Sequence, residues 1–110
     1  MENINQQQQQ ILDIINKTAK EAGVSVAMQK IGTAVLWAES NLDPNAVCKN
    51  RFSVDRGLAQ INSYWWKDVS VEQAFDPEFS ARFFWKWFPR FPQWWIAWKN
   101  KSYQKFLMQV

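Results

Sequence analysis

Two stripes of apolar residues at helical spacing near the start of the chain restrict the fold more than any other feature. The first stripe precedes Gly23, which is expected to end a helix, and Ser25 is expected to cap the next one. Asp43-Pro44 should end that second helix soon after about residue 40, because the residue before a proline avoids helical geometry. The stripes consist of Ile11, Ile14, Ile15, Thr18, Ala19 and Ala22, and of Ala27, Ile31, Ala34, Val35 and Ala38.

The rest of the chain predicts one irregular segment followed by further helices. Residues 45–57 lack a helical period and are rich in polar and turn-forming residues, which is typical of a short β-hairpin or loop. Asp76-Pro77 is a strong helix start, since a capping side chain precedes a proline in the first turn. The helices predicted after the hairpin cover residues 58–66, 77–88, 93–98 and 102–109.

Composition limits the chain to one folded domain. It has 110 residues, of which 47% are apolar, so it can bury one core but not two. Eight Trp and eight Phe leave two interpretations open: core packing, or aromatic surfaces that stack on sugar rings. The dense aromatic run at residues 83–88 is interpreted mainly as core, with contact to a partner protein or membrane as the alternative.

Charge is unevenly distributed along the sequence. Residues 1–78 hold seven Lys/Arg and ten Asp/Glu, whereas residues 79–110 hold six Lys/Arg and no acid. A basic final third indicates either an anionic partner, such as a cell wall, a membrane surface or nucleic acid, or ordinary solvated faces. No nucleic-acid motif accompanies the charge, so a nucleic-acid partner is not expected.

Several chemistries are excluded by residues that the chain lacks. Cys48 is the only cysteine and histidine is absent, which rules out an intrachain disulfide, a histidine triad and a Cys/His zinc site. Neither a metal nor an organic cofactor is expected. The polar N-terminus does not resemble a secretory signal and no segment has transmembrane length. We therefore expect synthesis in the cytoplasm and, if the target is a cell wall, delivery by another route.

Glu39 and Asp55 are the candidate catalytic residues. Glu39 continues the stripe of Ile31 and Val35 to the end of the second helix, where partial burial and the negative helix terminus should raise its pKa. A carboxyl group that keeps its proton is what a general acid needs, although a helix-end glutamate that reaches water or pairs with a lysine fits the same spacing. Asp55, just before Gly57, would supply a second carboxylate in a different environment. Such a pair is suited to the cleavage of glycosidic bonds.

Two motifs and a tryptophan segment resemble the lysozyme-like superfamily. Residues 38–46, Ala-Glu-Ser-Asn-Leu-Asp-Pro-Asn-Ala, with the later Gly57-Leu-Ala-Gln-Ile-Asn62, are similar to the soluble lytic transglycosylase (SLT) domain. Residues 53–66, Ser-Val-Asp-Arg-Gly-Leu-Ala-Gln-Ile-Asn-Ser-Tyr-Trp-Trp, resemble both C-type lysozymes and the specialised transglycosylases of secretion systems and phages. Residues 95–100 resemble the tryptophan segment of C-type lysozymes. The resemblance covers roughly residues 25–105. It departs from the family at Ala59, where a larger apolar residue is common, so that the groove is wider or a neighbouring aromatic fills the gap.

The resemblance implies a mainly α, α+β lysozyme-like fold with a small β-hairpin or loop element beside a glycan-binding cleft. Residues 1–24 would form an N-terminal helix and residues 25–110 the catalytic core of a single domain. Glu39 matches the family's acid/base and Asp55 the second carboxylate of lysozymes. The positions matching substrate-binding or cleft-bordering residues are Ser40, Gln60, Asn62, Trp66 and Trp95, although a core role behind Glu39 remains open for Trp95.

The implied activity is cleavage of the MurNAc–GlcNAc β-1,4 bond of peptidoglycan, and two mechanisms fit. A lytic transglycosylase gives 1,6-anhydro products and needs no second carboxylate, whereas a lysozyme-type hydrolase uses water with Asp55 in support. The Glu-Ser-x-Leu-Asp-Pro-x-Ala motif and the absence of disulfides favour the transglycosylase. A binding module without catalysis, or a part of a phage particle or envelope-spanning machine, are further hypotheses. The oligomeric state is left open.

Overall fold

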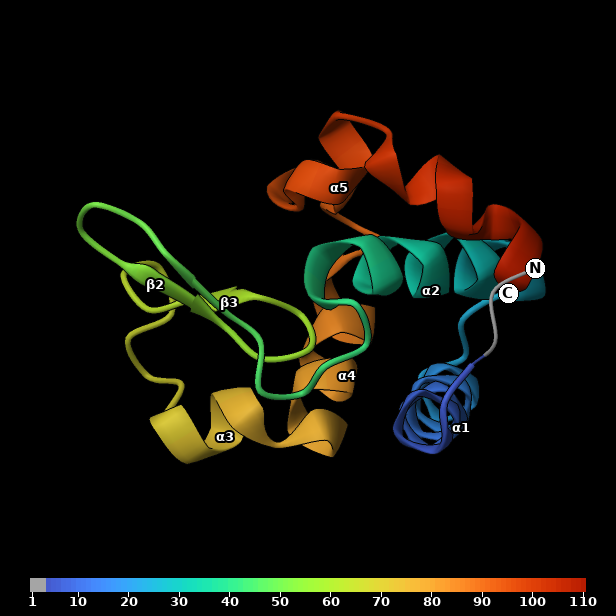
Figure 1. The fold of residues 1–110 in the computed structure, drawn as a ribbon, viewed down its shortest axis with the longest axis horizontal. Helices are drawn as coiled ribbons and strands as arrows, with labels where there is room; N and C mark the ends of the chain where they lie inside the picture. Colours follow the sequence, from blue (N-terminus) through green and yellow to red (C-terminus); the bar gives the residue numbers. More distant parts are fainter. Residues whose placement is uncertain (1–3) are drawn as a thin grey trace.

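The computed structural model describes residues 4–110; residues 1–3, which begin the predicted N-terminal segment 1–24, lie outside the described part. Helices dominate the chain, and one small sheet projects to one side of them (Figure 1). The mainly helical α+β fold predicted from the sequence is thus confirmed. The elements are α1 (Gln6–Glu21), α2 (Val26–Ser40), β1 (Val47–Lys49), β2 (Val54–Arg56), β3 (Ile61–Asn62), α3 (Val71–Phe75), α4 (Pro77–Trp87), η1 (Pro92–Trp94), α5 (Ile96–Lys99) and η2 (Ser102–Gln109).

Both predicted N-terminal helices form, and local capping explains their limits. The five glutamines belong to α1, which starts with a capping box between Asn5 and Gln8. Ser25 caps α2 by accepting a hydrogen bond from the Met28 amide at 3.2 Å. Asn41, which follows α2, is left-handed at φ 54°, so the helix ends before Asp43-Pro44.

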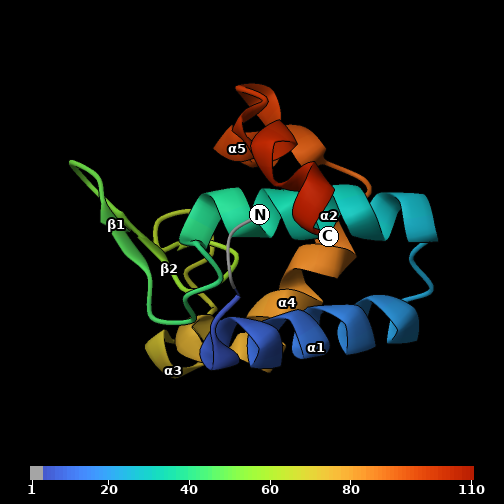
Figure 2. The same ribbon diagram turned by 45° about the vertical axis from the view of Figure 1, so that its right-hand side comes forward.

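The second helix forms the centre of the molecule. It lies between the α5–η2 segment on one side and α1 with α4 on the other (Figure 2). At Gly32 the two helices α2 and α4 cross closely, because a Cβ there would lie 2.4 Å from Cζ3 of Trp85. The core around this crossing has fully buried side chains from most of the chain, including Ile15, Leu36, Leu42, Leu58, Ile61, Phe84 and Phe88.

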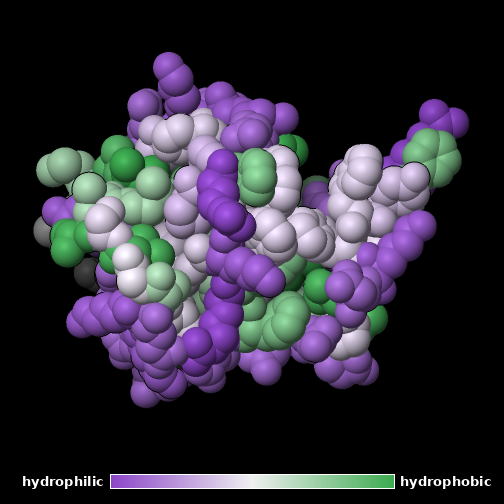
Figure 3. Space-filling model, turned by 180° about the vertical axis from the view of Figure 1, so that it is seen from behind, coloured by the Kyte–Doolittle hydropathy of each residue, from purple (hydrophilic) through white to green (hydrophobic). Residues whose placement is uncertain are grey.

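The sheet is an antiparallel meander in the order β1-β2-β3. Its register pairs Cys48 with Asp55 and Asp55 with Asn62. The hairpin between β1 and β2 confirms the prediction for residues 45–57, and it stands out from the body of the molecule (Figure 3). The sheet therefore presents the Asp55 region on an arm beside the helices.

The helix predicted over residues 58–66 was wrong. Turns occupy most of this segment, and Ile61–Asn62 is the third strand. Gly57 and Gln60 both have left-handed backbones, at φ 80° and 52°, which a helix cannot include. Leu58, Ala59 and Ile61 are all buried, whereas Tyr64 and Trp65 are exposed. The buried residues therefore lie together at the start of the segment and do not follow the period of a surface helix.

The C-terminal half is close to the prediction, with finer divisions. Asp76 caps α4 by accepting from the amides of Glu78 and Phe79, as expected, and the run 83–88 is mostly core. The predicted helix 93–98 is two short ones, since Trp95 between them is extended, and η2 is a 3₁₀ helix. The prediction missed α3, which Ser70 and Gln73 cap. No helix within residues 4–110 has the length and apolarity to cross a membrane.

Candidate active site

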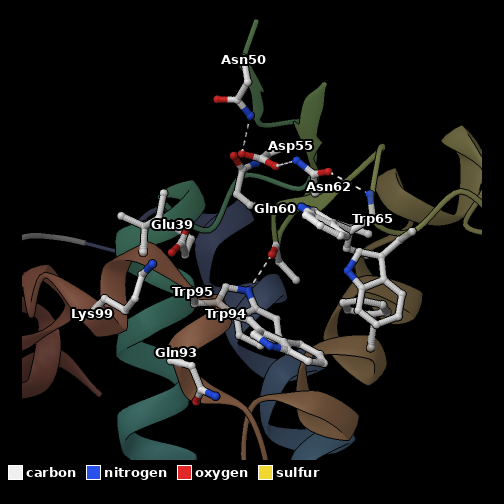
Figure 4. A pocket seen from close by; sticks show the side chains of 15 residues that line it. Glu39, Asn50, Asp55, Gln60, Asn62, Trp65, Gln93, Trp94, Trp95 and Lys99 are labelled. Carbon is white, nitrogen blue, oxygen red and sulfur yellow. Dashed lines mark hydrogen bonds between the residues drawn. The ribbon is translucent and has the colours of Figure 1, made fainter. Parts of the chain in front are cut away.

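A cleft of about 760 Å³ lies between the sheet and the η1–α5 segment, at the C-terminal end of α2 (Figure 4). It brings together six of the seven residues predicted for the site. Its lining comprises Glu39, Asn50, Asp55, Ala59, Gln60, Ile61, Asn62, Trp65, Trp66, Phe83, Gln93, Trp94, Trp95, Ile96 and Lys99. The seventh, Ser40, is not in this lining. It is buried, and its hydroxyl donates to the carbonyl of Leu36 at 3.0 Å, one turn back in α2.

Glu39 is a half-buried carboxyl group on the helical side of the cleft. It projects from the last turn of α2, and its Oε2 accepts a hydrogen bond from the backbone N–H of Ala97 at 2.8 Å. Burial raises the pKa of Glu39 above its ordinary value, the Ala97 hydrogen bond opposes this, and the negative charge of Asp55 adds to it. The raised pKa agrees with the expectation from the apolar stripe, and it favours the protonated acid.

Asp55 lies across the cleft on β2, and two amide side chains hold its carboxylate. Asn62 donates to Oδ1 at 2.8 Å and Asn50 donates to Oδ2 at 3.1 Å. The β2–β3 register places Asn62 opposite Asp55, and Asn50 comes from the hairpin turn. Both carboxylate oxygens therefore have a fixed direction, which the dashed lines in Figure 4 mark.

Asn62 connects the carboxylate to the segment that carries the cleft tryptophans. Its Oδ1 accepts hydrogen bonds from the backbone N–H groups of Tyr64 and Trp65, at 2.9 and 3.1 Å. Because its oxygen is committed to these donors, its amide nitrogen must point to Asp55 and to Ser53. The side chain of the predicted site residue Asn62 thus links the side chains of Ser53 and Asp55 to the backbone of Tyr64 and Trp65.

Gln60 closes the turn between β2 and β3. Its side-chain amide donates to the carbonyls of Gly57 and Ala46, at 2.9 and 3.3 Å, while its own backbone is left-handed. Gly57 is required beside it, because a Cβ at that position would lie 1.9 Å from the carbonyl oxygen of Ala74. Gln60 lines the cleft, yet the hydrogen bonds of its amide nitrogen go to the protein and hold the cleft wall.

Ala59 joins this turn to the helical part of the molecule. Its N–H donates to the hydroxyl of buried Ser80 at 2.9 Å, and its carbonyl accepts from the indole of Trp95 at 2.9 Å. Ser80 belongs to α4 and Trp95 lies between η1 and α5, so the N–H and the carbonyl of Ala59 are both held by the helical part of the molecule. The small side chain of Ala59 is fully buried beside Trp95, which agrees with the interpretation that a neighbouring aromatic fills the gap.

The predicted tryptophans have different environments. Trp95 is buried against Phe84 and Phe88 at the base of the cleft, as the core alternative anticipated. Trp66 is half-buried, and its ring packs edge-on against Phe83 at 4.8 Å. Each has a neighbour in sequence that the sequence analysis did not select: Trp65 is 76% exposed and Trp94 is 47% exposed. Both line the cleft and offer indole surface to a ligand.

The pairing of tryptophans was the signal that could have identified these two residues. In Trp65-Trp66 and in Trp94-Trp95, one ring is held in the protein, so its neighbour points elsewhere. Asn50, Gln93 and Lys99 had no comparable signal, since they are single polar residues in segments whose positions depend on the tertiary fold. No group of three His, Cys, Asp or Glu side chains in the part of the chain that the structure describes could hold a metal ion.

Residues 16–94 match the family model described as "Lysozyme like domain". No curated protein and no solved structure gives a significant match to the chain. The matched segment covers well over half of the chain and includes Glu39, Asp55, Gln60, Asn62 and Trp66. Members of this family are generally glycan-cleaving enzymes, and the match indicates peptidoglycan as the substrate. The chain therefore belongs to the lysozyme-like domain family.

Proposed function

We propose that this protein cleaves the β-1,4 bond between N-acetylmuramic acid and N-acetylglucosamine in peptidoglycan, with Glu39 as the general acid. One observation carries the proposal: Glu39 lies at the cleft, and burial raises its pKa. A protonated carboxyl group can donate to the glycosidic oxygen as the bond breaks. The Ala97 N–H holds Oε2, so the proton would be delivered from Oε1.

The reaction that we favour is that of a lytic transglycosylase. The N-acetyl oxygen of the muramyl unit attacks its own anomeric carbon while Glu39 protonates the departing oxygen. The Glu39 carboxylate then removes the proton of the 6-hydroxyl, whose oxygen displaces the N-acetyl oxygen and leaves a 1,6-anhydro ring. The Glu39–Ala46 motif supports this branch. Asp55, whose two oxygens already accept amide hydrogen bonds, would stabilise developing positive charge and would not act as a nucleophile.

A lysozyme-type hydrolase is the second candidate, and the position of Asp55 favours it. Asp55 lines the same cleft as Glu39, and its charge contributes to the raised pKa of Glu39. Two carboxyl groups with separate roles across one cleft are the usual arrangement for hydrolysis with water. In that case Asp55 would be the nucleophile or the electrostatic stabiliser.

Two further hypotheses concern glycan binding without cleavage and the delivery of the protein to the cell wall. The exposed indoles of Trp65 and Trp94 would also suit a domain that holds glycan and does not cut it. Delivery to the bacterial wall as part of a phage particle or an envelope-spanning assembly is compatible with either activity. Neither a metal nor an organic cofactor enters the proposed chemistry.

Digestion of purified peptidoglycan, followed by mass spectrometry of the released muropeptides, tests these proposals. We expect products that end in 1,6-anhydromuramic acid, lighter by one water than hydrolysis products. Reducing-end products would instead assign a hydrolase with Asp55 as the second catalytic carboxylate. Binding without release would contradict both enzymatic proposals and would support the glycan-binding role.

A further inference from the structure

Most basic residues of the C-terminal third form no ion pair with the acidic residues that the structure describes. Of the six Lys/Arg in residues 79–110, only Arg82 forms an ion pair within residues 4–110, with Glu21 and Glu78. The other five, Lys86, Arg90, Lys99, Lys101 and Lys105, are exposed and have no ion pair among the described residues. The positive charge of these five residues is therefore not neutralised by ion pairs within the part of the chain that the structure describes.

Three of these five residues are close in sequence, at the end of α5 and in the segment that follows it. Lys99 ends α5, Lys101 precedes η2, and Lys105 lies on η2; we call these three residues the lysine ridge. Lys99 lines the cleft, and Figure 4 shows its side chain reaching toward the Glu39 side. Lys99 thus gives the α5 side of the cleft a positive charge, with Lys101 two residues further along the chain, whereas the facing sheet contributes Asp55.

Local structure offers little other reason for this charge. A cation at a helix C-terminus stabilises the helix dipole, but α5 has only four residues and so only a small dipole. Lys105 lies over the ring of the adjacent Phe106, at 5.4 Å, whereas Lys99 and Lys101 have no cation–π contact within residues 4–110. Unpaired cations beside a ligand cleft attract anionic groups of that ligand.

We propose that the lysine ridge binds carboxylates carried by the muramyl units of the substrate, so that the protein prefers acidic, stem-bearing glycan to neutral glycan of the same length. This inference rests on the proposed function. In peptidoglycan every second sugar bears a lactyl group that extends into a peptide stem with free carboxylates, and a chain lying in the cleft would bring these groups alongside α5. Lysines suit such ligands, because a flexible ammonium group can follow a mobile carboxylate.

Binding to the full-length Glu39→Gln variant tests the ridge without turnover of the probes. The probes are chitohexaose, which is neutral, and a hexasaccharide of alternating GlcNAc and MurNAc that carries peptide stems. We expect about tenfold tighter binding of the stem-bearing probe at low salt, since several exposed ion pairs each contribute a modest amount. Adding Lys99→Gln and Lys101→Gln should bring the ratio of the two dissociation constants close to one.

A matched control carries the same charge change elsewhere. Lys20→Gln with Lys30→Gln removes two positive charges at a second cavity, whose lining shares no residue with the cleft. This control should keep the tenfold ratio of the two dissociation constants. With the lysine ridge unchanged, about 0.5 M salt should bring that ratio close to one. Equal binding of both probes, or a ratio that survives either loss of the lysines or high salt, would overturn the proposal.

Two further experiments are needed. One tests whether the ridge binds carboxylates or phosphates, and the other tests the ridge separately from the proposed cleavage activity. A glycerol phosphate oligomer, which lacks sugar, should bind weakly; ridge-dependent binding as tight as that of the stem-bearing probe would assign the ridge to phosphate and reject our proposal. The active chain is also assayed for cleavage of chitohexaose and of peptidoglycan. Cleavage without any preference for stems would reject the ridge and leave the proposed function intact, whereas no binding of either glycan would reject both.

Discussion

The two walls of the cleft are built in different ways. The helical wall, from α2 and the segment 92–99, rests on the buried core, and its functional group Glu39 is partly withdrawn from water. The sheet wall has only short strands, and side-chain hydrogen bonds among Asn50, Asp55 and Asn62 hold it together. Burial thus favours the protonated form of Glu39 on the helical wall, and a network of polar side chains fixes the orientation of the Asp55 carboxylate on the sheet wall.

This division assigns separate tasks to the two carboxyl groups. A general acid must hold a proton near neutral pH, and desolvation by a rigid apolar wall provides that. A carboxylate that supports positive charge must stay fixed across the cleft from the acid, and amide donors provide that. We therefore expect substitutions in the helical wall to reduce proton transfer and stability. Substitutions in the sheet wall should reduce the rate of cleavage by a smaller factor.

The largest effect is expected for Glu39→Gln, on the helical wall. Glutamine keeps the size of the side chain and can still accept the Ala97 N–H, but it cannot donate the proton, so muropeptide release should fall about a thousandfold. The rate of release from purified peptidoglycan measures this. Circular dichroism and the urea midpoint show whether the fold is retained, and an active variant would remove Glu39 from its assigned role.

Trp95→Phe tests the connection between the walls. The substitution removes the indole donor to the Ala59 carbonyl and leaves that buried oxygen without its partner, at a cost of about 2 kcal/mol in the free energy of unfolding. The matched control is Trp98→Phe, because the indole N–H of Trp98 donates no hydrogen bond to any of residues 4–110 and its ring stacks on Tyr103. Equal losses in urea denaturation would mean that ring size, and not the hydrogen bond, connects the walls.

Asp55→Asn tests the sheet wall. Under the transglycosylase proposal the N-acetyl group is the nucleophile, so loss of the Asp55 charge should reduce muropeptide release only about tenfold, or roughly 1.4 kcal/mol. The assay is the one used for Glu39→Gln, with the two variants compared at the same pH. A loss of muropeptide release as large as that of Glu39→Gln would mean that both carboxyl groups are essential for cleavage, and it would favour the hydrolase.

Sequence reasoning succeeded where structure is decided locally. Ser25 and Asp76-Pro77 begin helices through contacts within a few residues, and both starts were predicted. The spacing of Ile31 and Val35 was sufficient to place Glu39 at a partly buried helix end. The Ser70 and Gln73 capping box of α3 was also local, and it could have been recognised in the sequence.

Sequence reasoning failed where distant residues decide the conformation. The turn after Gly57 was mistaken for a helix because its buried apolar residues resemble one. Its conformation depends on Ser80 and Trp95, which hold Ala59 from 21 and 36 positions away. The roles of Asn50 and Lys99 likewise depend on the hairpin turn and on the docking of α5, neither of which a periodic pattern encodes.

The smallest expected effect concerns stability, and it tests whether burial on the helical wall is what holds the proton. Because the folded protein raises the pKa of Glu39 above its ordinary value of 4.5, the folded state binds this proton more tightly than the unfolded state. The resulting stabilisation is complete below the unfolded pKa and is lost as the pH rises through the folded pKa. Glutamine does not titrate, so the Glu39→Gln variant does not lose stability in this way as the pH rises. The free energy of unfolding of the variant minus that of wild type should therefore increase with pH across this range. Urea titrations of both proteins over a pH series measure the difference, in which contributions from titrating groups that do not interact with Glu39 cancel; parallel curves would show that the helical wall does not perturb Glu39.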